Sequence, residues 1–223
     1  MMWKQLQIWG DSLLKGVVFD EIRNRYQILR GNCVQQLTAL LPFPVENNAR
    51  MGCTAPEGFE MLKEGEMQPG GLALIEYGGN DCDMDWAAVA ADPSKDHQPK
   101  TSPEVFASML EQCVERVREA DMQPMLVVPT PLHAPRYFDW VTRGLDRAAV
   151  LGFLGDVERI YRWQERYALL VCTTASKLRC PLINLRDAFL AVKGYERLLC
   201  IDGIHPNAEG HALMLDTMKA VLC

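Results

Sequence analysis

Short apolar runs alternate with amphipathic stretches along this chain, and the alternation predicts buried strands connected by helices. The clearest run, Leu72 to Tyr77, is almost continuously apolar and follows two glycines, which is typical of a central strand buried on both faces. Near the start, Lys4 to Ile8 alternates polar and apolar residues, as a strand does. The predicted strands are residues 4–8, 45–49, 72–77, 125–128 and 182–185.

Between the strands, apolar residues recur at intervals of three and four, which predicts amphipathic helices. Several are preceded by a polar residue suited to cap a first helical turn, as Asn32, Thr54 and Ser102 are. Asp83 to Thr101 has little periodicity and is expected to be a long surface insertion, and Leu132 to Gly144 is expected to be irregular. The predicted helices are residues 13–18, 32–41, 54–62, 102–117, 155–178, 187–192 and 207–222, with an irregular stretch between 18 and 30.

Strand and helix alternate five times, and this order predicts a parallel sheet with helices on both faces, a doubly wound α/β fold. The chain has 223 residues, which is enough for one domain with a substantial core. We therefore expect residues 1–223 to form a single domain. In such folds, ligands bind at the carboxyl ends of the strands.

Composition narrows the function further. The net charge is −6 and no basic cluster occurs, so nucleic acid is not expected as a partner. The mean hydropathy is −0.09 and no apolar run approaches the roughly 20 residues of a membrane helix. A candidate active serine at position 12 leaves no room before it for a secretory signal peptide, so a cytoplasmic location is expected.

Eight cysteines are scattered along the sequence, and no two of them form a Cys-x-x-Cys pair. This spacing does not favour a zinc site, and the cysteines are expected to stay reduced. Cys53 and Cys82 flank two of the motifs described below and are interpreted as small apolar filler. A metal is therefore not expected.

The stretch Trp9-Gly10-Asp11-Ser12-Leu13 follows the first predicted strand and opens a helix. That placement puts the Ser12 hydroxyl at the ligand-binding edge of the sheet, with its backbone N–H at a helix start, where negative charge is stabilised. Taken alone, the motif favours Ser12 acting only as a helix cap, and three later stretches reverse this preference.

A candidate base lies near the other end of the chain, in Asp202-Gly203-Ile204-His205-Pro206. The three-residue spacing allows the Asp202 carboxylate to face one nitrogen of His205 and leaves the other nitrogen free. A loop histidine bonded only to backbone is the alternative. His97 and His133 are candidates for substrate contact, whereas His211 is interpreted as structural.

Two glycine-containing loops supply candidate donors for an oxyanion. Gly78-Gly79-Asn80-Asp81 follows the central strand, and the Asn80 amide can donate to a developing negative charge. A hairpin turn is the alternative for this stretch. Gly52 offers an unobstructed backbone N–H in the loop after the second strand.

Together the four stretches resemble the motifs of the SGNH (GDSL) hydrolase family, in the same order and over essentially the whole chain. The resemblance implies a three-layer α/β/α sandwich whose five-stranded parallel sheet has the flavodoxin-like order 2-1-3-4-5. It implies Ser12 as nucleophile, His205 as base and Asp202 as the residue that orients the base. Ser12, Gly52 and Asn80 would form the oxyanion hole, without metal or cofactor.

The expected function is hydrolysis of small acyl esters through an acyl-Ser12 intermediate, with acetylated carbohydrate as a candidate substrate. The alternatives are a thioesterase or acyltransferase, or a non-catalytic carbohydrate-binding module on the same fold. Four aromatic residues of the two long loops are expected to roof the pocket or, alternatively, to anchor the loops, and this leaves the alcohol and the acyl length open. They are Trp86, Tyr137, Phe138 and Trp140.

Overall fold

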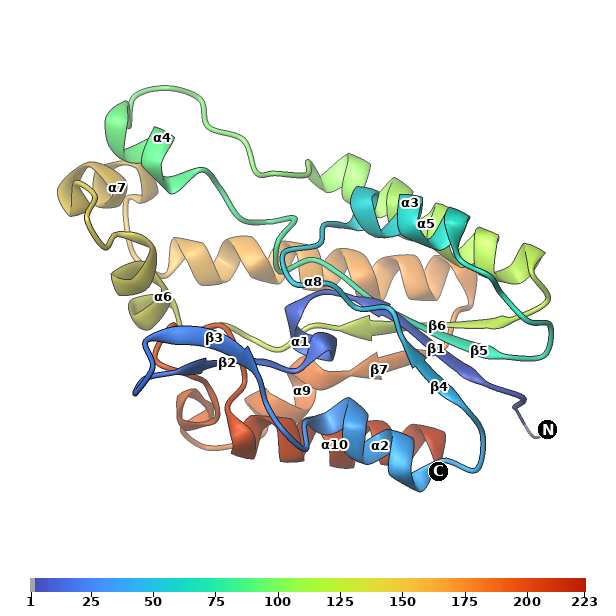
Figure 1. The fold of residues 1–223 in the computed structure, drawn as a ribbon. Coiled ribbons are helices and arrows are strands. Elements are labelled where there is room, and N and C mark those ends of the chain that lie inside the picture. The colour runs from blue at the N-terminus through green and yellow to red at the C-terminus, as the bar shows by residue number, and fades with distance from the viewer. Residues whose placement is uncertain (1–2) are drawn as a thin grey trace.

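Five parallel strands form the central sheet of the computed structural model, which describes residues 3–223 (Figure 1). In chain order they are β1 (Leu6–Gly10), β4 (Val45–Asn47), β5 (Leu72–Glu76), β6 (Gln123–Val128) and β7 (Leu182–Asn184). Their spatial order is β4-β1-β5-β6-β7, and every neighbouring pair is parallel. Ranked along the chain, this is the order 2-1-3-4-5, so the predicted topology is confirmed.

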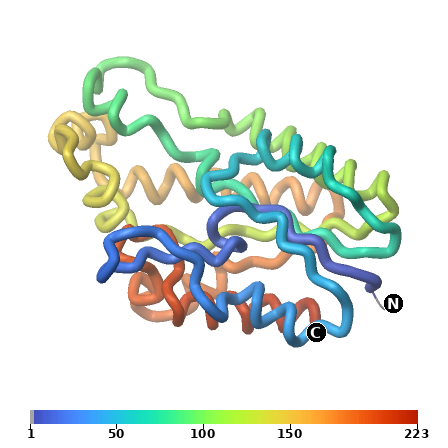
Figure 2. The backbone as a smooth tube through the Cα atoms, viewed as in Figure 1, coloured from blue at the N-terminus to red at the C-terminus, as the bar shows by residue number. Residues whose placement is uncertain are grey.

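Helices cover both faces of this sheet, as Figures 1 and 2 show. One layer contains α3 (Ala55–Glu64), α5 (Pro103–Glu119) and α8 (Arg159–Leu178); the other contains α2 (Cys33–Leu40), α9 (Leu185–Leu190) and α10 (Ala208–Leu222). The longest, α8, has 20 residues and carries several charged side chains. No helix within residues 3–223 combines the length and apolarity needed to cross a membrane.

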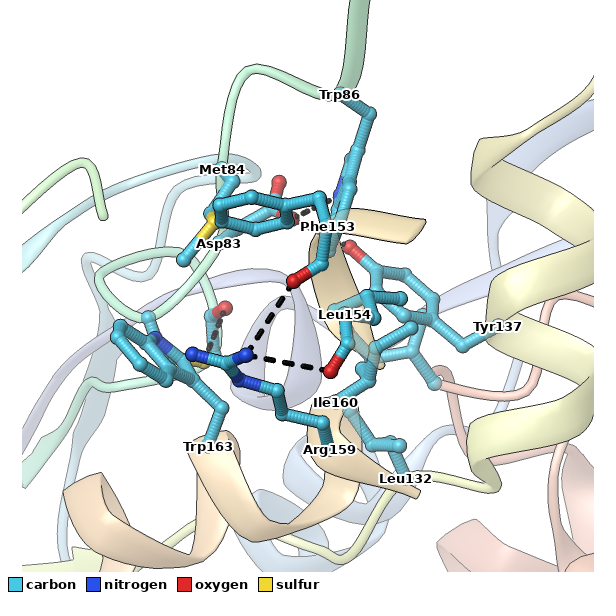
Figure 3. Close-up of a pocket in the computed structure, with 13 residues that line it drawn as sticks. Asp83, Met84, Trp86, Leu132, Tyr137, Phe153, Leu154, Arg159, Ile160 and Trp163 are labelled. Carbon is cyan, nitrogen blue, oxygen red and sulfur yellow. Dashed lines mark hydrogen bonds between the residues drawn. The ribbon is translucent and has the colours of Figure 1, made fainter. Parts of the chain in front are cut away.

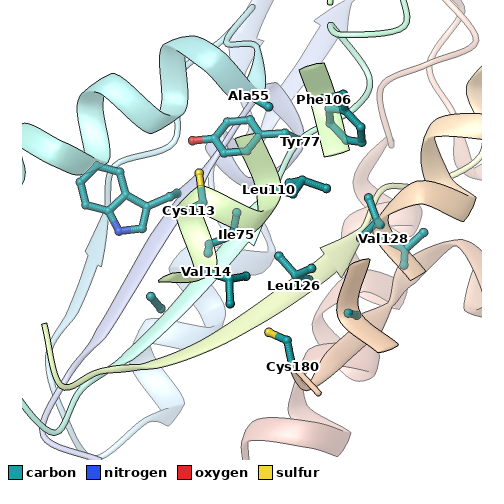
Figure 4. Packing of buried hydrophobic residues seen from close by; sticks show 14 of the residues in the cluster. Ala55, Ile75, Tyr77, Phe106, Leu110, Cys113, Val114, Leu126, Val128 and Cys180 are labelled. Atoms are coloured by element: carbon teal, nitrogen blue, oxygen red, sulfur yellow. The ribbon is translucent and has the colours of Figure 1, made fainter. Parts of the chain in front are cut away.

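Each face of the sheet builds its own hydrophobic core, because side chains alternate along a strand. In β5, Ala73 and Ile75 pack with α3, α5 and α8, in the core drawn in Figure 4. Leu72 and Leu74 point the other way, into the core shared with α2 and α10. A strand buried on both faces needs apolar residues at nearly every position, and this explains the continuous run in the sequence.

The predicted helix starts agree with the capping contacts. The Asn32 side chain accepts hydrogen bonds from the first turn of α2, and Ser102 caps α5 in the same way. Thr54 forms a capping box with Glu57 at the start of α3. These contacts satisfy N–H groups that have no partner within their own helix.

The prediction of a helix over 13–18 followed by an irregular stretch is wrong. The helix α1 (Ser12–Lys15) is one turn long, and Gly16, at φ +83°, ends it in the left-handed conformation. The chain then forms an antiparallel hairpin of β2 (Val17–Asp20) and β3 (Arg25–Ile28). The hairpin has no regular apolar alternation in β3, whose residues are exposed or half-buried, so the sequence pattern did not reveal it.

The two stretches expected to lack regular structure contain helices. The insertion holds α4 (Trp86–Ala91), and the aromatic-rich segment holds α6 (Ala134–Val141). A further helix, α7 (Arg147–Leu154), ends at Gly155, where φ is +79°, so α8 starts at residue 159 and not at 155. These helices pack on one another in a third apolar cluster at the carboxyl ends of the strands (Figure 1). A short 3₁₀ helix, Tyr195–Leu198, precedes the last loop.

Candidate active site

Ser12 is the first residue of α1, directly after β1. The preceding residue, Asp11, caps this turn by accepting a hydrogen bond of 2.9 Å from the Leu13 N–H. Asp11 therefore performs the capping that the sequence left open for Ser12, and the Ser12 hydroxyl faces a cleft. The Ser12 N–H makes no hydrogen bond to another residue of the described chain.

The imidazole of His205 lies between the Ser12 hydroxyl and the Asp202 carboxylate. His205 Nε2 is 2.9 Å from Ser12 Oγ, and His205 Nδ1 is 2.6 Å from Asp202 Oδ2. Burial raises the pKa of Asp202, but the hydrogen bonds and charge of His205 outweigh it, so the pKa lies below its ordinary value. Asp202 is thus ionised and fixes Nδ1 of His205 as the protonated nitrogen, which leaves Nε2 to accept a proton from Ser12.

The loop that carries both residues is held tightly. The second oxygen of Asp202, Oδ1, accepts hydrogen bonds from the N–H groups of Ile204 and His205, at 3.1 and 3.2 Å. Gly203 has φ +74°, and a Cβ built there would come within 2.7 Å of the Tyr137 backbone nitrogen. Only glycine meets both conditions, which explains its presence between the two reactive residues.

Gly52 lies in the turn after β4 and borders the same cleft as Ser12. Its φ is +79°, and a Cβ there would meet nothing within 4 Å. Its N–H is not bonded within the described chain. Because the space around Gly52 is open and its backbone N–H has no partner, Gly52 is suited to donate to a bound molecule.

Asn80 also borders the cleft, but its amide is already engaged. Nδ2 donates to Asp11 Oδ2 at 2.9 Å and to the Cys53 carbonyl at 3.2 Å. Both hydrogens therefore have protein partners, and an oxyanion would have to draw one of them from Cys53, the longer contact. The sequence indicated the donor but not these competing acceptors.

A buried carboxyl pair lies behind Ser12 and was missed in the sequence analysis. Glu76 is fully buried at the end of β5, and its Oε2 accepts a hydrogen bond of 3.3 Å from the Asp11 N–H. The Asp11 side chain is itself buried. Burial, and next the nearby Asp11 charge, raise the pKa of Glu76 well above its ordinary value. A glutamate in an otherwise apolar central strand was the signal that pointed to this pair.

An apolar pocket opens from the cleft, and Gly79 and Ile204 line both (Figure 3). Its walls come from the two long segments and the start of α8. Trp86 and Tyr137 do roof this pocket, whereas Phe138 is buried in the third apolar cluster and Trp140 packs on the β2–β3 hairpin. Two of the four aromatic residues, Trp86 and Tyr137, therefore roof the pocket, and the other two anchor the segments that carry them.

A second hollow beside the cleft is a groove between the β2–β3 hairpin and the loop after β4, and Met51 lines both the groove and the cleft. Polar side chains, among them Lys15 and Arg50, line this groove together with apolar ones. Tyr26 of β3 lines it and places its ring 5.1 Å from the His205 ring. The hairpin thus forms one wall of the candidate site.

The remaining sequence candidates lie elsewhere. His97 bonds the Asp92 carbonyl and packs on Phe153, and His133 caps α6; neither lines the cleft. His211 is buried with Nδ1 3.2 Å from Cys33 Sγ, a structural position as expected.

All eight cysteines are free, and Cys53 and Cys82 are buried among apolar residues. In residues 3–223 no group of three or more His, Cys, Asp or Glu side chains is arranged to hold a metal ion.

Comparisons with known proteins agree with the observed fold and show the family. A family model described as GDSL-like Lipase/Acylhydrolase matches residues 8–213. The chain is similar in fold to a lipase/acylhydrolase from Enterococcus faecalis, with 17% identity, TM-score 0.64, and coverage of 99% of this chain and 97% of that one. It is also similar to a variant of an acetyl-xylooligosaccharide esterase from Geobacillus, with 16% identity, TM-score 0.69, and coverage of 100% and 95%. No curated protein matches the sequence.

Proposed function

Because the chain belongs to the GDSL-like lipase/acylhydrolase family, we propose that it hydrolyses small acyl esters with Ser12, His205 and Asp202 as its catalytic residues. Membership of that family makes it a carboxylic ester hydrolase. The observation that supports the residue assignment is the continuous line of hydrogen bonds from Ser12 Oγ through the His205 ring to Asp202 Oδ2, at 2.9 and 2.6 Å. Nucleophile, base and orienting carboxylate are the three groups that such a reaction needs.

In the first half of the reaction, His205 Nε2 takes the hydroxyl proton as Ser12 Oγ attacks the ester carbonyl carbon. The carbonyl π electrons move to oxygen and form a tetrahedral oxyanion. Asp202 stabilises the positive charge that His205 acquires, because the pKa of Asp202 lies below its ordinary value and the group stays ionised. When the intermediate collapses, His205 gives its proton to the departing alcohol oxygen, and an acyl-Ser12 ester remains.

The oxyanion is stabilised by donors that already face the cleft. The N–H groups of Ser12 and Gly52 have no partner in the described chain. Asn80 Nδ2 adds a third donor when its hydrogen turns from the Cys53 carbonyl, now 3.2 Å away, to the oxyanion. Such an exchange favours the transition state, because a charged oxygen accepts more strongly than a neutral carbonyl.

In the second half, water replaces the alcohol. His205 Nε2 removes a proton from the water, the hydroxide attacks the acyl carbon, and the second tetrahedral intermediate uses the same oxyanion donors. Collapse breaks the bond to Ser12 Oγ, which regains the proton from His205, and the carboxylic acid leaves. The chain ends in its starting state, and no step requires another reactant.

An ester of a polar alcohol is the substrate that the surroundings favour. The groove beside Tyr26 carries Lys15, Arg50 and the Asn48 amide, whose buried Nδ2 has no hydrogen-bond partner in the described chain. These donors suit a sugar hydroxyl or another polar alcohol. The acetyl-xylooligosaccharide esterase among the structural neighbours is the reason to include acylated carbohydrate.

Turnover of a chromogenic acetate ester tests the proposal. The wild-type protein should release the chromophore, and Ser12→Ala should reduce the rate to background while leaving the melting temperature within a few degrees, since Ser12 makes one side-chain hydrogen bond. Absence of turnover by the folded wild-type protein would favour a non-catalytic binding module. Equal rates for the wild type and Ser12→Ala would reject Ser12 as the nucleophile.

A further inference from the structure

The apolar pocket beside the cleft has walls that contain almost no available hydrogen-bonding group (Figure 3). Asp83 Oδ1 accepts from Trp86 Nε1 at 2.8 Å and from Tyr137 Oη at 2.7 Å. Its other oxygen, Oδ2, accepts from Lys100 at 2.9 Å. The carboxylate is thus fully occupied, and it fixes two aromatic walls of the pocket.

The guanidinium of Arg159 is also engaged. Its Nη1 donates to the carbonyls of Phe153 and Leu154, at 3.3 and 3.2 Å, and so ties the end of α7 to the start of α8. The buried indole N–H of Trp163 has no partner in the described chain. A sugar ring needs several donors and acceptors around its hydroxyls, whereas the Trp163 indole N–H and the N–H groups of Arg159 other than those on Nη1 are donors only. The pocket therefore suits a hydrocarbon.

Pocket and groove adjoin the cleft at different residues, the pocket at Gly79 and Ile204 and the groove at Met51, so the two halves of an ester can meet different surroundings. The alcohol oxygen must lie beside His205 Nε2, which protonates it. Tyr26, which packs on the His205 ring, lines the groove and not the apolar pocket. This places the alcohol in the groove and leaves the pocket to the acid.

We propose that the apolar pocket binds the acyl group, and that the substrate is an ester of a polar alcohol with a hydrocarbon acid longer than acetic acid. The inference rests on the proposed function and extends it to the substrate class. Leu154, at 4% exposure, Ile160 and Leu132 would contact the acyl chain. A buried methylene contributes about 0.8 kcal/mol, or roughly a fourfold gain in kcat/KM for each carbon added to the acid.

Two series of esters test which half of the substrate the pocket binds. For ethyl esters of acetate through octanoate, wild-type kcat/KM should rise by about fourfold for each methylene until the pocket is filled. For alkyl acetates from ethyl to octyl, the dependence should be shallow. Leu154→Trp fills the pocket and should flatten the acid series.

Leu151→Trp is the matched control, because Leu151 lies on the same helix with 39% of its surface exposed and does not line the pocket. This variant should behave as the wild type does. A steep alkyl series that Leu154→Trp flattens would show that the pocket takes the alcohol and would overturn the proposal. An acid series unaffected by Leu154→Trp would overturn it as well.

Binding of octanoate separates this proposal from the proposed function. Titrated into the inactive Ser12→Ala protein, octanoate should bind more tightly than acetate, and adding Leu154→Trp should remove the difference. If no ester is hydrolysed but octanoate binding depends on Leu154, the proposal that the pocket binds the acyl group is supported and the catalytic proposal is rejected. If acetate esters are hydrolysed and octanoate binds no better than acetate, the proposal that the pocket binds the acyl group is rejected and the catalytic proposal is supported.

A second, independent inference concerns the buried carboxyls of Asp11 and Glu76 behind Ser12, where Glu76 Oε2 accepts a hydrogen bond of 3.3 Å from the Asp11 N–H. No lysine or arginine forms an ion pair with either group in the described chain. Two buried carboxylates in contact cannot both be charged, so the pair holds a proton. Asp11 accepts from two N–H donors, Leu13 and Asn80, both at 2.9 Å, and is the member suited to the charge.

We infer that Glu76 is a neutral carboxylic acid whose Oε2 accepts from the Asp11 N–H, and that it positions the Asn80 amide toward the oxyanion through Asp11. Asp11 holds one hydrogen of Asn80 Nδ2, which directs the other hydrogen toward the Cys53 carbonyl and the cleft. Glu76 does not line the cleft, so it acts only through Asp11. The proton on Glu76 also lowers the negative charge near the place where the oxyanion forms.

Glu76→Gln and Glu76→Leu test this role. Gln is neutral and keeps an oxygen acceptor for the Asp11 N–H, so it should retain kcat within a few-fold, whereas Leu should lower kcat on the order of tenfold with little change in KM, as loss of one hydrogen bond implies. Infrared difference spectra should show the C=O band of a neutral carboxylic acid in the wild type and not in Glu76→Gln. Unchanged kcat in folded Glu76→Leu, or a wild type without that band, would overturn the inference.

Discussion

His205 connects the two ends of the chain at one point. It lies 193 residues from Ser12 in sequence, yet its ring bonds the Ser12 hydroxyl on one side and Asp202 on the other. The short spacing of Asp202 and His205 made their contact predictable, because a three-residue loop allows it. The contact with Ser12 was predictable only through the family resemblance, since no local pattern indicates a pair so far apart.

Asn80→Ala should lower kcat by about 10²–10³-fold and leave KM within a few-fold, because the amide acts mainly on the charged transition state. Steady-state kinetics and the melting temperature, measured on one preparation, check this. The hydrogen bonds of Asn80 to Asp11 and Cys53 are also structural contacts. If those contacts are its whole role, the melting temperature falls and kcat stays near the wild-type value.

Asp81 shows how a motif residue can serve the fold and not the cleft. Its Oδ1 accepts from the Ala55 N–H at 2.9 Å at the start of α3, and it does not line the cleft. Burial raises the pKa of Asp81 to about 6. The sequence placed it beside Asn80 but carried no signal of this distant backbone partner.

Replacing Asp81 by asparagine should change how stability depends on pH. The folded pKa of about 6 lies above the ordinary value of 3.8, so the folded wild type binds more protons than the unfolded chain between these pH values. It therefore loses stability as the pH rises through them. Asp81→Asn keeps an oxygen that accepts from the Ala55 N–H, but its side chain does not titrate, so the variant does not lose stability in this way as the pH rises. Relative to wild type, the variant should gain up to about 3 kcal/mol between pH 3.5 and 7 in urea unfolding. A difference that does not vary with pH would contradict this pKa shift.

At the scale of elements, the sequence pattern was most informative where burial is complete. The strands β1, β5 and β6 lie close to their predicted positions, because two buried faces require a continuous or alternating apolar pattern. The hairpin of β2 and β3 was missed because its residues pack on distant aromatic rings and not on the central cores. Phe19 and Tyr26, for example, both contact Trp140.

The short helices α4, α6 and α7 were missed for a related reason. Each has only six or eight residues and buries its apolar side chains against the other two and the start of α8. So short a segment shows too few repeats of the helical period for the pattern to be recognised. The pocket they enclose was accordingly invisible in the sequence, although its two roof aromatics were named.

Gly203→Ala should disrupt the loop that holds His205 more than a left-handed glycine elsewhere would. Gly203 and Gly144 have nearly the same φ, +74° and +73°, but only Gly203 has backbone atoms within 3 Å of a built Cβ. Gly144→Ala should therefore cost about 1–2 kcal/mol of stability, the cost of the left-handed conformation, and keep full activity. Gly203→Ala should cost more and lose most ester hydrolysis. Chemical unfolding and kinetics of both variants check this, and equal behaviour would contradict the packing argument.

At the scale of the whole molecule, the site depends on segments from the entire chain. Ser12 follows β1, Gly52 follows β4, Asn80 follows β5, and His205 lies in the loop before α10. All of them meet at the carboxyl edge of one parallel sheet, where open α/β folds bind ligands. The alternation of strands and helices was sufficient to predict this edge, and the third apolar cluster that covers it was not predictable.

We propose that residues 1–223 fold as one domain, since all the strands of the central sheet pair in one continuous order and both helical layers pack on it. Thermal unfolding should therefore give one cooperative transition, with coincident curves by far-UV circular dichroism and tryptophan fluorescence. Trp9 lies in a core against the sheet and Trp86 in the third cluster, so fluorescence reports on both regions. Two resolved transitions would show that the third cluster unfolds separately.

The central claim is that Ser12 is acylated during turnover, and covalent labelling tests it most directly. After treatment with a serine-directed phosphonate, peptide mass spectrometry should place one adduct on Ser12, in proportion to the loss of ester hydrolysis. His205→Ala should label far more slowly, because Nε2 of His205, 2.9 Å from Ser12 Oγ, removes the hydroxyl proton. An active, inhibited protein whose adduct lies on any other residue would contradict the account.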